Sequence, residues 1–103
     1  MPHRRLRVGV TRKLPDAVEA RLSALFDTIL NPAGAPLSAD RLVALAQDVD
    51  VLAPTLGDAL DAAFFARAGD RLKLVANFGA GVDHIDVAAA NARGVTVTNT
   101  PSV

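Results

Sequence analysis

Two glycines in residues 77–83, read NFGAGVD, are the positions of this chain best suited to holding a ligand. Gly79 and Gly81 follow the apolar run 74–76, which has the composition of a buried strand. Glycines let the backbone bend so that successive N–H groups point into one concavity, and such a nest binds anions. The stretch therefore predicts a site where backbone amides hold a small carboxylate. A tight strand-to-helix turn without a ligand is the alternative that these residues alone leave open.

The same turn departs from the G-x-G-x-x-G fingerprint of dinucleotide-binding loops. His84 stands where a third glycine would allow close packing of helix on strand, and no acidic residue ends the following strand where a ribose would bind. We therefore expect no cofactor phosphate at this turn. Asp83 and His84 are a weak signal for proton transfer because adjacent side chains usually point apart, and no second His or Cys lies nearby to complete a metal site.

The site has two candidate walls: the first, earlier in the chain, follows the apolar run 49–53, and the second is the glycine turn. Thr55 and Leu56 come after this run, as the glycine turn comes after the run at 74–76. In open α/β sheets, ligands bind outside the carboxyl ends of the strands. Thr55 and Leu56 are therefore expected at the same edge as the glycines, either bordering the same cleft or forming a loop without a ligand.

The elements that must position these residues alternate regularly along the chain. Strands are predicted over 6–10, 28–30, 49–53, 73–77 and 95–98, and helices are predicted to begin near Pro15, Ser38, Asp58 and Asp86. Gly69 and Gly94 are placed to end the last two helices. This order predicts an α/β fold, with a flavodoxin-like parallel five-stranded sheet in the order 2-1-3-4-5 and helices on both faces. Half of a Rossmann fold is the alternative.

Apolar residues recur along one face of the first predicted helix. Leu14, Val18, Leu22, Leu25 and Phe26 predict its buried stripe, and Glu19, Arg21 and Ser23 are expected on the opposite, solvated side.

Composition excludes several classes of function. The 103 residues carry 11 basic and 11 acidic side chains, so no cluster of positive charge is available for nucleic acid or an anionic membrane. The chain has no cysteine, Trp or Tyr, and no apolar run approaches the roughly 20 residues of a membrane span. We expect a cytoplasmic protein whose partner is a small molecule.

Residues 75–101, with their core GAGVDHID and their ending VTVTNTP, closely resemble the D-isomer-specific 2-hydroxyacid dehydrogenases. Glyoxylate and hydroxypyruvate reductases are the nearest members, and the opening VGVTRKLP matches more loosely. The resemblance implies that residues 1–103 are the N-terminal part of the family's substrate-binding (catalytic) domain. It also implies that the nucleotide-binding domain, which carries NAD or NADP, is absent from this chain, and that the intact protein is a homodimer.

The resemblance also implies roles for individual residues. Amides around Ala80 and Gly81 would hold the substrate carboxylate, with Gly79 in the same turn, Phe78 and Val82 as supporting neighbours, and Thr55 and Leu56 at the substrate's other end. In the family, the catalytic Arg, Glu and His come after the segment that corresponds to Asn99-Thr100-Pro101. The resemblance therefore implies no catalytic residue, cofactor ligand or metal ligand in this chain. The intact protein would reduce a 2-oxo acid by hydride transfer from NAD(P)H, and the 103-residue fragment alone would be inactive.

A non-enzymatic flavodoxin-like module, such as a receiver or a ligand-binding domain, is the competing interpretation. A receiver needs an acidic pair after the first strand and an Asp at the end of the third strand. The chain has Thr11-Arg12-Lys13 and Ala53-Pro54 at these places, which favours the dehydrogenase.

Overall fold

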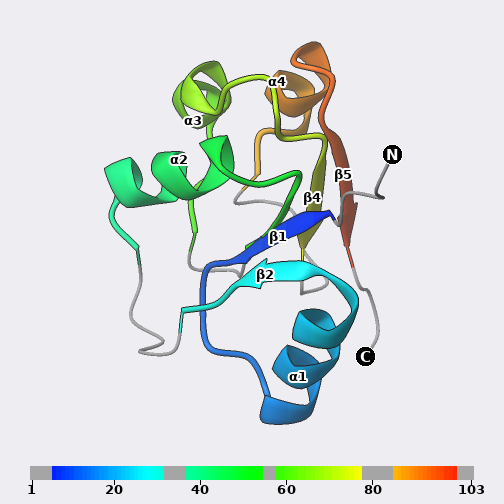
Figure 1. Cartoon of the computed structure of the whole chain (residues 1–103). Helices are drawn as coiled ribbons and strands as arrows, with labels where there is room; N and C mark the ends of the chain where they lie inside the picture. Colours follow the sequence, from blue (N-terminus) through cyan, green and yellow to red (C-terminus); the bar gives the residue numbers. More distant parts are fainter. Residues whose placement is uncertain (1–5, 32–36, 55–57, 78–84, 100–103) are drawn as a thin grey trace.

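The computed structural model describes residues 6–31, 37–54, 58–77 and 85–99, in which strands and helices alternate (Figure 1). The elements are β1 (Arg7–Val10), α1 (Asp16–Leu25), β2 (Asp27–Ile29), α2 (Ala39–Gln47), β3 (Val51–Ala53), α3 (Ala62–Arg67), β4 (Leu74–Asn77), α4 (Val87–Ala92) and β5 (Thr96–Asn99). Each predicted strand is present, shifted or shortened by one or two residues at its ends. No helix within the described ranges is long and apolar enough to cross a membrane.

All strand pairs are parallel, and the sheet has the order β2-β1-β3-β4-β5. This confirms the flavodoxin-like prediction and shows that the Rossmann alternative was wrong. The register aligns Val10 with Ala53, Leu52 with Val75, and Asn77 with Asn99. The carboxyl ends of β1, β3, β4 and β5 therefore lie at one edge of the sheet.

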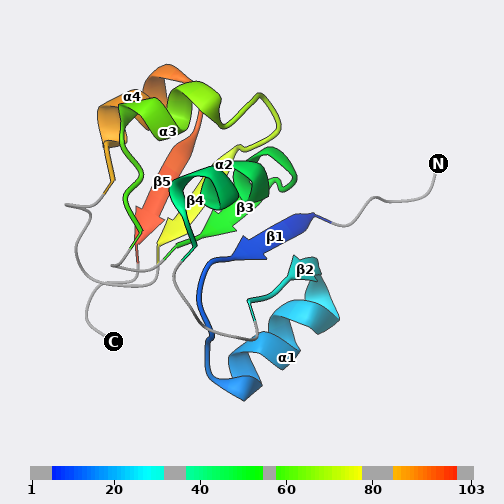
Figure 2. The same cartoon turned by 90° about the vertical axis from the view of Figure 1, so that its left-hand side faces the viewer.

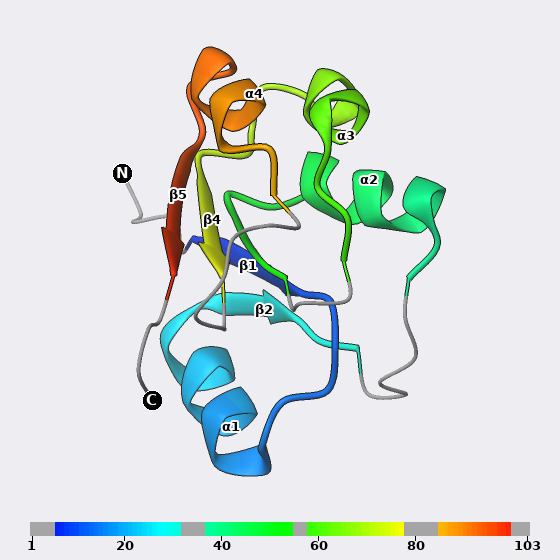
Figure 3. The ribbon, with the colours of Figure 1, turned by 180° about the vertical axis from the view of Figure 1, so that it is seen from behind.

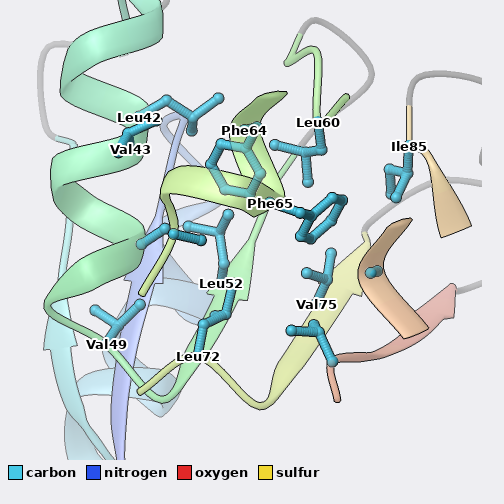
Figure 4. Close-up of a cluster of buried hydrophobic side chains, with 14 residues drawn as sticks. Leu42, Val43, Val49, Leu52, Leu60, Phe64, Phe65, Leu72, Val75 and Ile85 are labelled. Carbon is cyan, nitrogen blue, oxygen red and sulfur yellow. The ribbon is translucent and has the colours of Figure 1, made fainter. Parts of the chain in front are cut away.

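Helices α2, α3 and α4 cover one face of the sheet, and α1 lies on the other face beside β2 (Figures 1, 2 and 3). The larger core lies beneath the three helices, and Figure 4 shows its side chains converging from α2, α3 and the strands. Phe64 and Phe65 pack edge to face at its centre, with ring centroids 5.0 Å apart. The core also includes Leu42, Ala46, Val49, Leu52, Leu60, Leu72, Val75, Ile85 and Val95.

The face that carries α1 is only partly covered. Val8, Val10 and Ala53 form a small core with side chains of the α1 region. Toward β4, an apolar cavity of about 240 Å³ is lined by Leu6, Val8, Leu22, Phe26, Val51, Ala53, Leu74 and Ala76. Parallel sheets are usually buried on both faces, but in the described part of the chain no helix lies over this side of β4 and β5 (Figure 3).

The helix starts agree with the predictions except at α3. Ser38 and Asp86 cap α2 and α4 by accepting hydrogen bonds from the N–H groups of Arg41 and Ala89. The cap of α3 is Asp61, which accepts from Phe64 N at 2.9 Å, so the prediction that Asp58 caps this helix was wrong. The reason is that Leu60 is fully buried and pairs with Ile85, which keeps the chain extended up to the start of the helix.

The predicted stripe on α1 was wrong at three positions. Glu19 is buried, whereas the side chains of Val18 and Leu25 are 37% and 56% exposed. Glu19 accepts a hydrogen bond from Leu14 N at 3.1 Å and pairs with Lys13 Nζ at 2.8 Å. The carboxylate of Glu19 therefore accepts hydrogen bonds from two groups of the loop that leads into the helix. Helical periodicity does not reveal such contacts.

Candidate functional site

Polar and proline residues form a row across the carboxyl edge of the sheet. Because Val10 pairs with Ala53 and Leu52 with Val75, the next positions along the strands bring Thr11, Pro54 and Asn77 level with one another. Asn99 continues the row as the strand partner of Asn77. Thr11, Pro54 and Asn77 are almost fully buried. Buried polar groups require hydrogen-bond partners, so this edge is an ordered part of the protein.

Thr11 is held by three different segments. Its backbone N–H donates to Ala53 O at 3.3 Å, and its carbonyl accepts from Asn31 Nδ2 at 2.9 Å. Its hydroxyl donates a hydrogen bond to Asp58 Oδ2. Asp58 is only 3% exposed, so its carboxyl group depends on such contacts to offset the cost of leaving water. The end of β1 is thereby joined to the chain that follows β3.

A second connection joins the chain after β3 to the chain before α4. Leu60 pairs with Ile85 in an isolated parallel bridge, and Asp86 N donates to Leu60 O at 2.8 Å. Leu60 and Ile85 also pack in the larger core beneath α2, α3 and α4, as Figure 4 shows. Residues 58–60 are therefore attached to β1 on one side and to the start of α4 on the other.

The seven residues predicted to bind substrate are Thr55, Leu56, Phe78, Gly79, Ala80, Gly81 and Val82, and all of them lie outside the described residues. The structure does describe the strands that precede them. Residues 55–57 follow the end of β3 and residues 78–84 follow the end of β4, and these strands are neighbours in the sheet. The two predicted walls therefore begin side by side.

Sequence reasoning missed Thr11, Asp58 and Asn77 as members of this edge. For Thr11 and Asn77 the available signal was a polar residue directly at the end of an apolar strand. Asp58 had no such signal, because an acidic residue shortly before a helix is most simply a cap.

The loop after Thr11 contains the clearest electrostatic network. Hydrogen bonds from Lys13 to Asp16 at 2.7 Å and to Glu19 at 2.8 Å hold the pKa values of both carboxyl groups below their ordinary values. The same two hydrogen bonds raise the pKa of Lys13. This network fixes the loop that leads into α1. Its charged groups, Lys13, Asp16 and Glu19, pair with one another.

The start of α4 does not suit a dinucleotide. A pyrophosphate binds at a helix N-terminus that offers free N–H groups, but the N-terminus of α4 is capped by the carboxylate of Asp86, 2.9 Å from Ala89 N. The negative charge of Asp86 would also repel a phosphate there. Within the described ranges, no group of three or more His, Asp or Glu side chains is placed to hold a metal ion.

Comparisons with known proteins agree with this arrangement. Residues 8–103 match the family model described as D-isomer specific 2-hydroxyacid dehydrogenase, catalytic domain. A glyoxylate reductase of Korarchaeum cryptofilum is 38% identical over 97 residues, which are 94% of this chain and 29% of that protein. A glycerate dehydrogenase of Hyphomicrobium methylovorum is 30% identical over 95 residues, which are 92% of this chain and 30% of that protein.

Solved structures show the same relationship. A Polaromonas sp. JS6 66 protein assigned to the D-isomer specific 2-hydroxyacid dehydrogenases superimposes with a TM-score of 0.89 at 31% identity, covering 94% of this chain and 30% of that chain. An NADPH-dependent glyoxylate/hydroxypyruvate reductase of Sinorhizobium meliloti, in complex with NADP and malonate, gives 0.71 at 36% identity, covering 95% and 29%. The chain thus spans less than a third of the length of these relatives. The sequence match and the shared fold together show that this chain belongs to the D-isomer specific 2-hydroxyacid dehydrogenase family.

Proposed function

We propose that this chain is the N-terminal, substrate-binding portion of an NAD(P)-dependent 2-hydroxyacid dehydrogenase. The intact enzyme would reduce a small 2-oxo acid such as glyoxylate or hydroxypyruvate. The names of the relatives support this substrate class, since they include glyoxylate reductases and a glycerate dehydrogenase.

The observation that carries the proposal is the position of β3 and β4 as neighbours whose carboxyl ends are level. One candidate wall follows each strand, so both walls can contact one small ligand. In this proposal, amides of Gly79, Ala80 and Gly81 donate hydrogen bonds to the substrate carboxylate, and Phe78 and Val82 support the turn. Such charge-assisted bonds fix the orientation of a small acid. The malonate in the Sinorhizobium meliloti complex is a small carboxylate of the kind such a site would take.

Thr55 and Leu56 would border the other end of the substrate. Their place directly after Pro54, which is fully buried in the row, supports this role because the segment starts from a fixed point. A hydroxyl next to an aliphatic side chain suits the short polar substituent of a small hydroxy or oxo acid.

The nicotinamide cofactor, NAD or NADP, would be bound by another domain of a longer protein and would supply the hydride. The catalytic Arg, Glu and His would belong to that domain too. Two observations support a longer protein: the relatives are more than three times as long, and an apolar sheet face near Leu74 and Ala76 has no described helix over it. On the family resemblance, the intact enzyme is proposed to be a cytoplasmic homodimer.

The test is a spectrophotometric assay of the intact protein with NADH or NADPH and a panel of small 2-oxo acids. We expect oxidation of the cofactor with glyoxylate or hydroxypyruvate. The 103-residue chain alone is expected to give no turnover, and it serves as the control. Absence of activity with every 2-oxo acid of the panel would refute the proposed function, and turnover by the 103-residue chain would refute the assignment of catalysis to another domain.

A further inference from the structure

The buried pair Thr11–Asp58 connects segments that are distant in the sequence. Asp58 follows the first candidate wall directly, and its carboxylate accepts from the hydroxyl of Thr11, 47 residues earlier in the chain. Both side chains are almost completely removed from solvent. Burying a carboxyl group is unfavourable unless hydrogen bonds replace its lost hydration, so this pair has little freedom to rearrange.

The backbone of Thr11 adds to this rigidity. Its N–H and its carbonyl are both engaged, by Ala53 and by Asn31, so the hydroxyl is presented from a fixed point at the ends of β1, β2 and β3. Pro54, which is fully buried, and Asp58 bracket residues 55–57 in the sequence. The first candidate wall therefore starts and finishes at anchored residues.

The chain that follows Asp58 is also bonded to the chain that follows the second wall. Two residues after Asp58, Leu60 pairs with Ile85, and Asp86 N donates to Leu60 O at 2.8 Å. Residues 78–84, which contain the glycine turn, immediately precede Ile85. A displacement of Asp58 would therefore be transmitted through residues 58–60 to the chain that follows the glycine turn.

From this geometry we infer that Thr11 and Asp58 are positioning residues for the substrate site: their hydrogen bond sets the spacing between the segments that carry the two walls. This inference rests on the proposed function and deepens it, because neither residue needs to touch the substrate. A shift of about 1 Å in substrate position can lower the rate of a well-oriented reaction by roughly a hundredfold.

The test uses three variants of the intact enzyme. Thr11→Val removes the hydroxyl at nearly constant volume, Thr11→Ser retains it, and Thr28→Val is the matched control. Thr28 lies within β2, away from the row, and its hydroxyl makes half-buried hydrogen bonds to Leu22 O at 2.9 Å and Phe26 O at 3.3 Å. Each variant is measured for kcat, for the KM of the 2-oxo acid and for urea unfolding.

We expect Thr11→Val to lower kcat/KM roughly ten- to a hundredfold, through a lower kcat, a higher KM or both, and Thr11→Ser to restore it. Thr28→Val is expected to lose stability while its kcat and KM stay at the wild-type values. A kcat/KM in Thr11→Val no lower than in Thr28→Val would show that the bond serves stability alone and would overturn the inference. In that case the wild type would still be active, whereas failure of the proposed function would appear as an inactive wild type.

A double-mutant cycle gives an independent measure. If Thr11 and Asp58 act through one hydrogen bond, the double variant Thr11→Val/Asp58→Ala should lose no more kcat/KM than Asp58→Ala alone. Losses that simply multiply would contradict a shared role and would overturn the inference as well.

Discussion

The two edges of the sheet hold polar residues under different conditions. At the amino edge, Arg7 pairs with Asp48 at 2.9 Å and with Asp27 at 3.3 Å, and Arg71 pairs with Asp50 at 3.4 Å. The carboxylates of Asp27 and Asp48 are more than half exposed. Solvent and salt screen the two pairs of Arg7, so each contributes little to stability and tolerates substitution, whereas the carboxylate of Asp50 is 18% exposed and is screened less.

At the carboxyl edge the polar side chains are buried and mostly uncharged. Thr11, Asp58 and Asn77 are at most 3% exposed. Groups removed from water depend on the geometry of their partners, because a lost hydrogen bond there is not replaced by solvent. We therefore expect substitutions at the amino edge to change stability slightly and, under the proposed function, substitutions at the carboxyl edge to change substrate binding. Four experiments test this difference between the two edges.

The largest effect is expected at the glycine turn of the carboxyl edge. In the intact enzyme, Gly81→Val should raise the KM of the 2-oxo acid by roughly a hundredfold, because a branched side chain would crowd the amides proposed to hold the carboxylate. Gly94→Ala is the control. Gly94 has a φ of +76°, which disfavours a side chain, so this substitution should cost about 1–2 kcal/mol of stability and leave the KM unchanged. An unchanged KM in Gly81→Val would contradict the carboxylate site.

Gly9, in the middle of β1, tests a position away from both edges. A Cβ here would lie 2.9 Å from Leu45 Cγ and Cδ1 and 3.1 Å from Val49 Cγ1, so α2 can approach β1 this closely only over a glycine. Gly9→Ala should lower the free energy of urea unfolding by about 1–3 kcal/mol through overpacking.

The double variant Gly9→Ala/Leu45→Ala should unfold at higher urea than Leu45→Ala alone if the clash with Leu45 is the cause. The KM of Gly9→Ala, measured at urea concentrations below the unfolding transition, should equal the wild-type KM. A KM changed as strongly as in Gly81→Val would show that binding does not depend specifically on the carboxyl edge.

A smaller effect is expected for the ion pairs of the amino edge. Arg7→Met should lower the free energy of unfolding by no more than about 1 kcal/mol in dilute buffer, and the loss should shrink in high salt. Arg7→Lys retains the charge and is the matched variant. A loss that persists undiminished in high salt would mean that the packing of the Arg7 side chain, rather than its charge, is the stabilising factor.

The smallest effect is expected on the pH dependence of the free energy of unfolding, to which the pairs of Lys13 with Asp16 and Glu19 contribute. The pKa values of Asp16 and Glu19 are lowered from 3.8 and 4.5, so their stabilisation is present above these values and is lost as pH falls through the folded-state pKa values. The pKa of Lys13 is raised from 10.5, so its stabilisation is present below that value and is lost as pH rises through the folded-state pKa.

Lys13→Met should therefore be less stable than the wild type in the neutral range, and the difference should vanish in both acid and alkali. Urea unfolding measured across this range checks the expectation. A difference that stays constant into acid would indicate that the Lys13 side chain contributes by packing alone.

Sequence patterns predicted the fold well where local rules decide it. The apolar runs, the caps Ser38 and Asp86, and the glycines at 69 and 94 each depend on contacts within a few residues. The alternation of strands and helices predicted a parallel sheet but left both the order 2-1-3-4-5 and half of a Rossmann fold open, and the strand pairs of the structure decide between them. Helical periodicity was misleading at Glu19, because its partners Lys13 and Leu14 belong to the preceding loop rather than to the helix.

The candidate site was predicted less completely, because its framework depends on contacts between distant segments. Asp58 was predicted to be a cap, and only the fold shows that its partner is Thr11. The position of Asn77 level with Pro54 depends on the register between β3 and β4, which one sequence does not specify. The glycine turn was predicted from local residues, and both the turn and its binding role stay predictions, because residues 78–84 lie outside the described ranges.

Under the proposed function, the bridge between Leu60 and Ile85 also bears on how substrate preference could be redesigned. Because it ties the chain after β3 to the chain before α4, exchanging residues 55–57 alone would leave Leu60 bonded to the original Ile85 and Asp86, which follow residues 78–84 in the sequence. Residues 54–86 are better treated as a single cassette, transplanted from one family member to another together with a compatible residue at position 11.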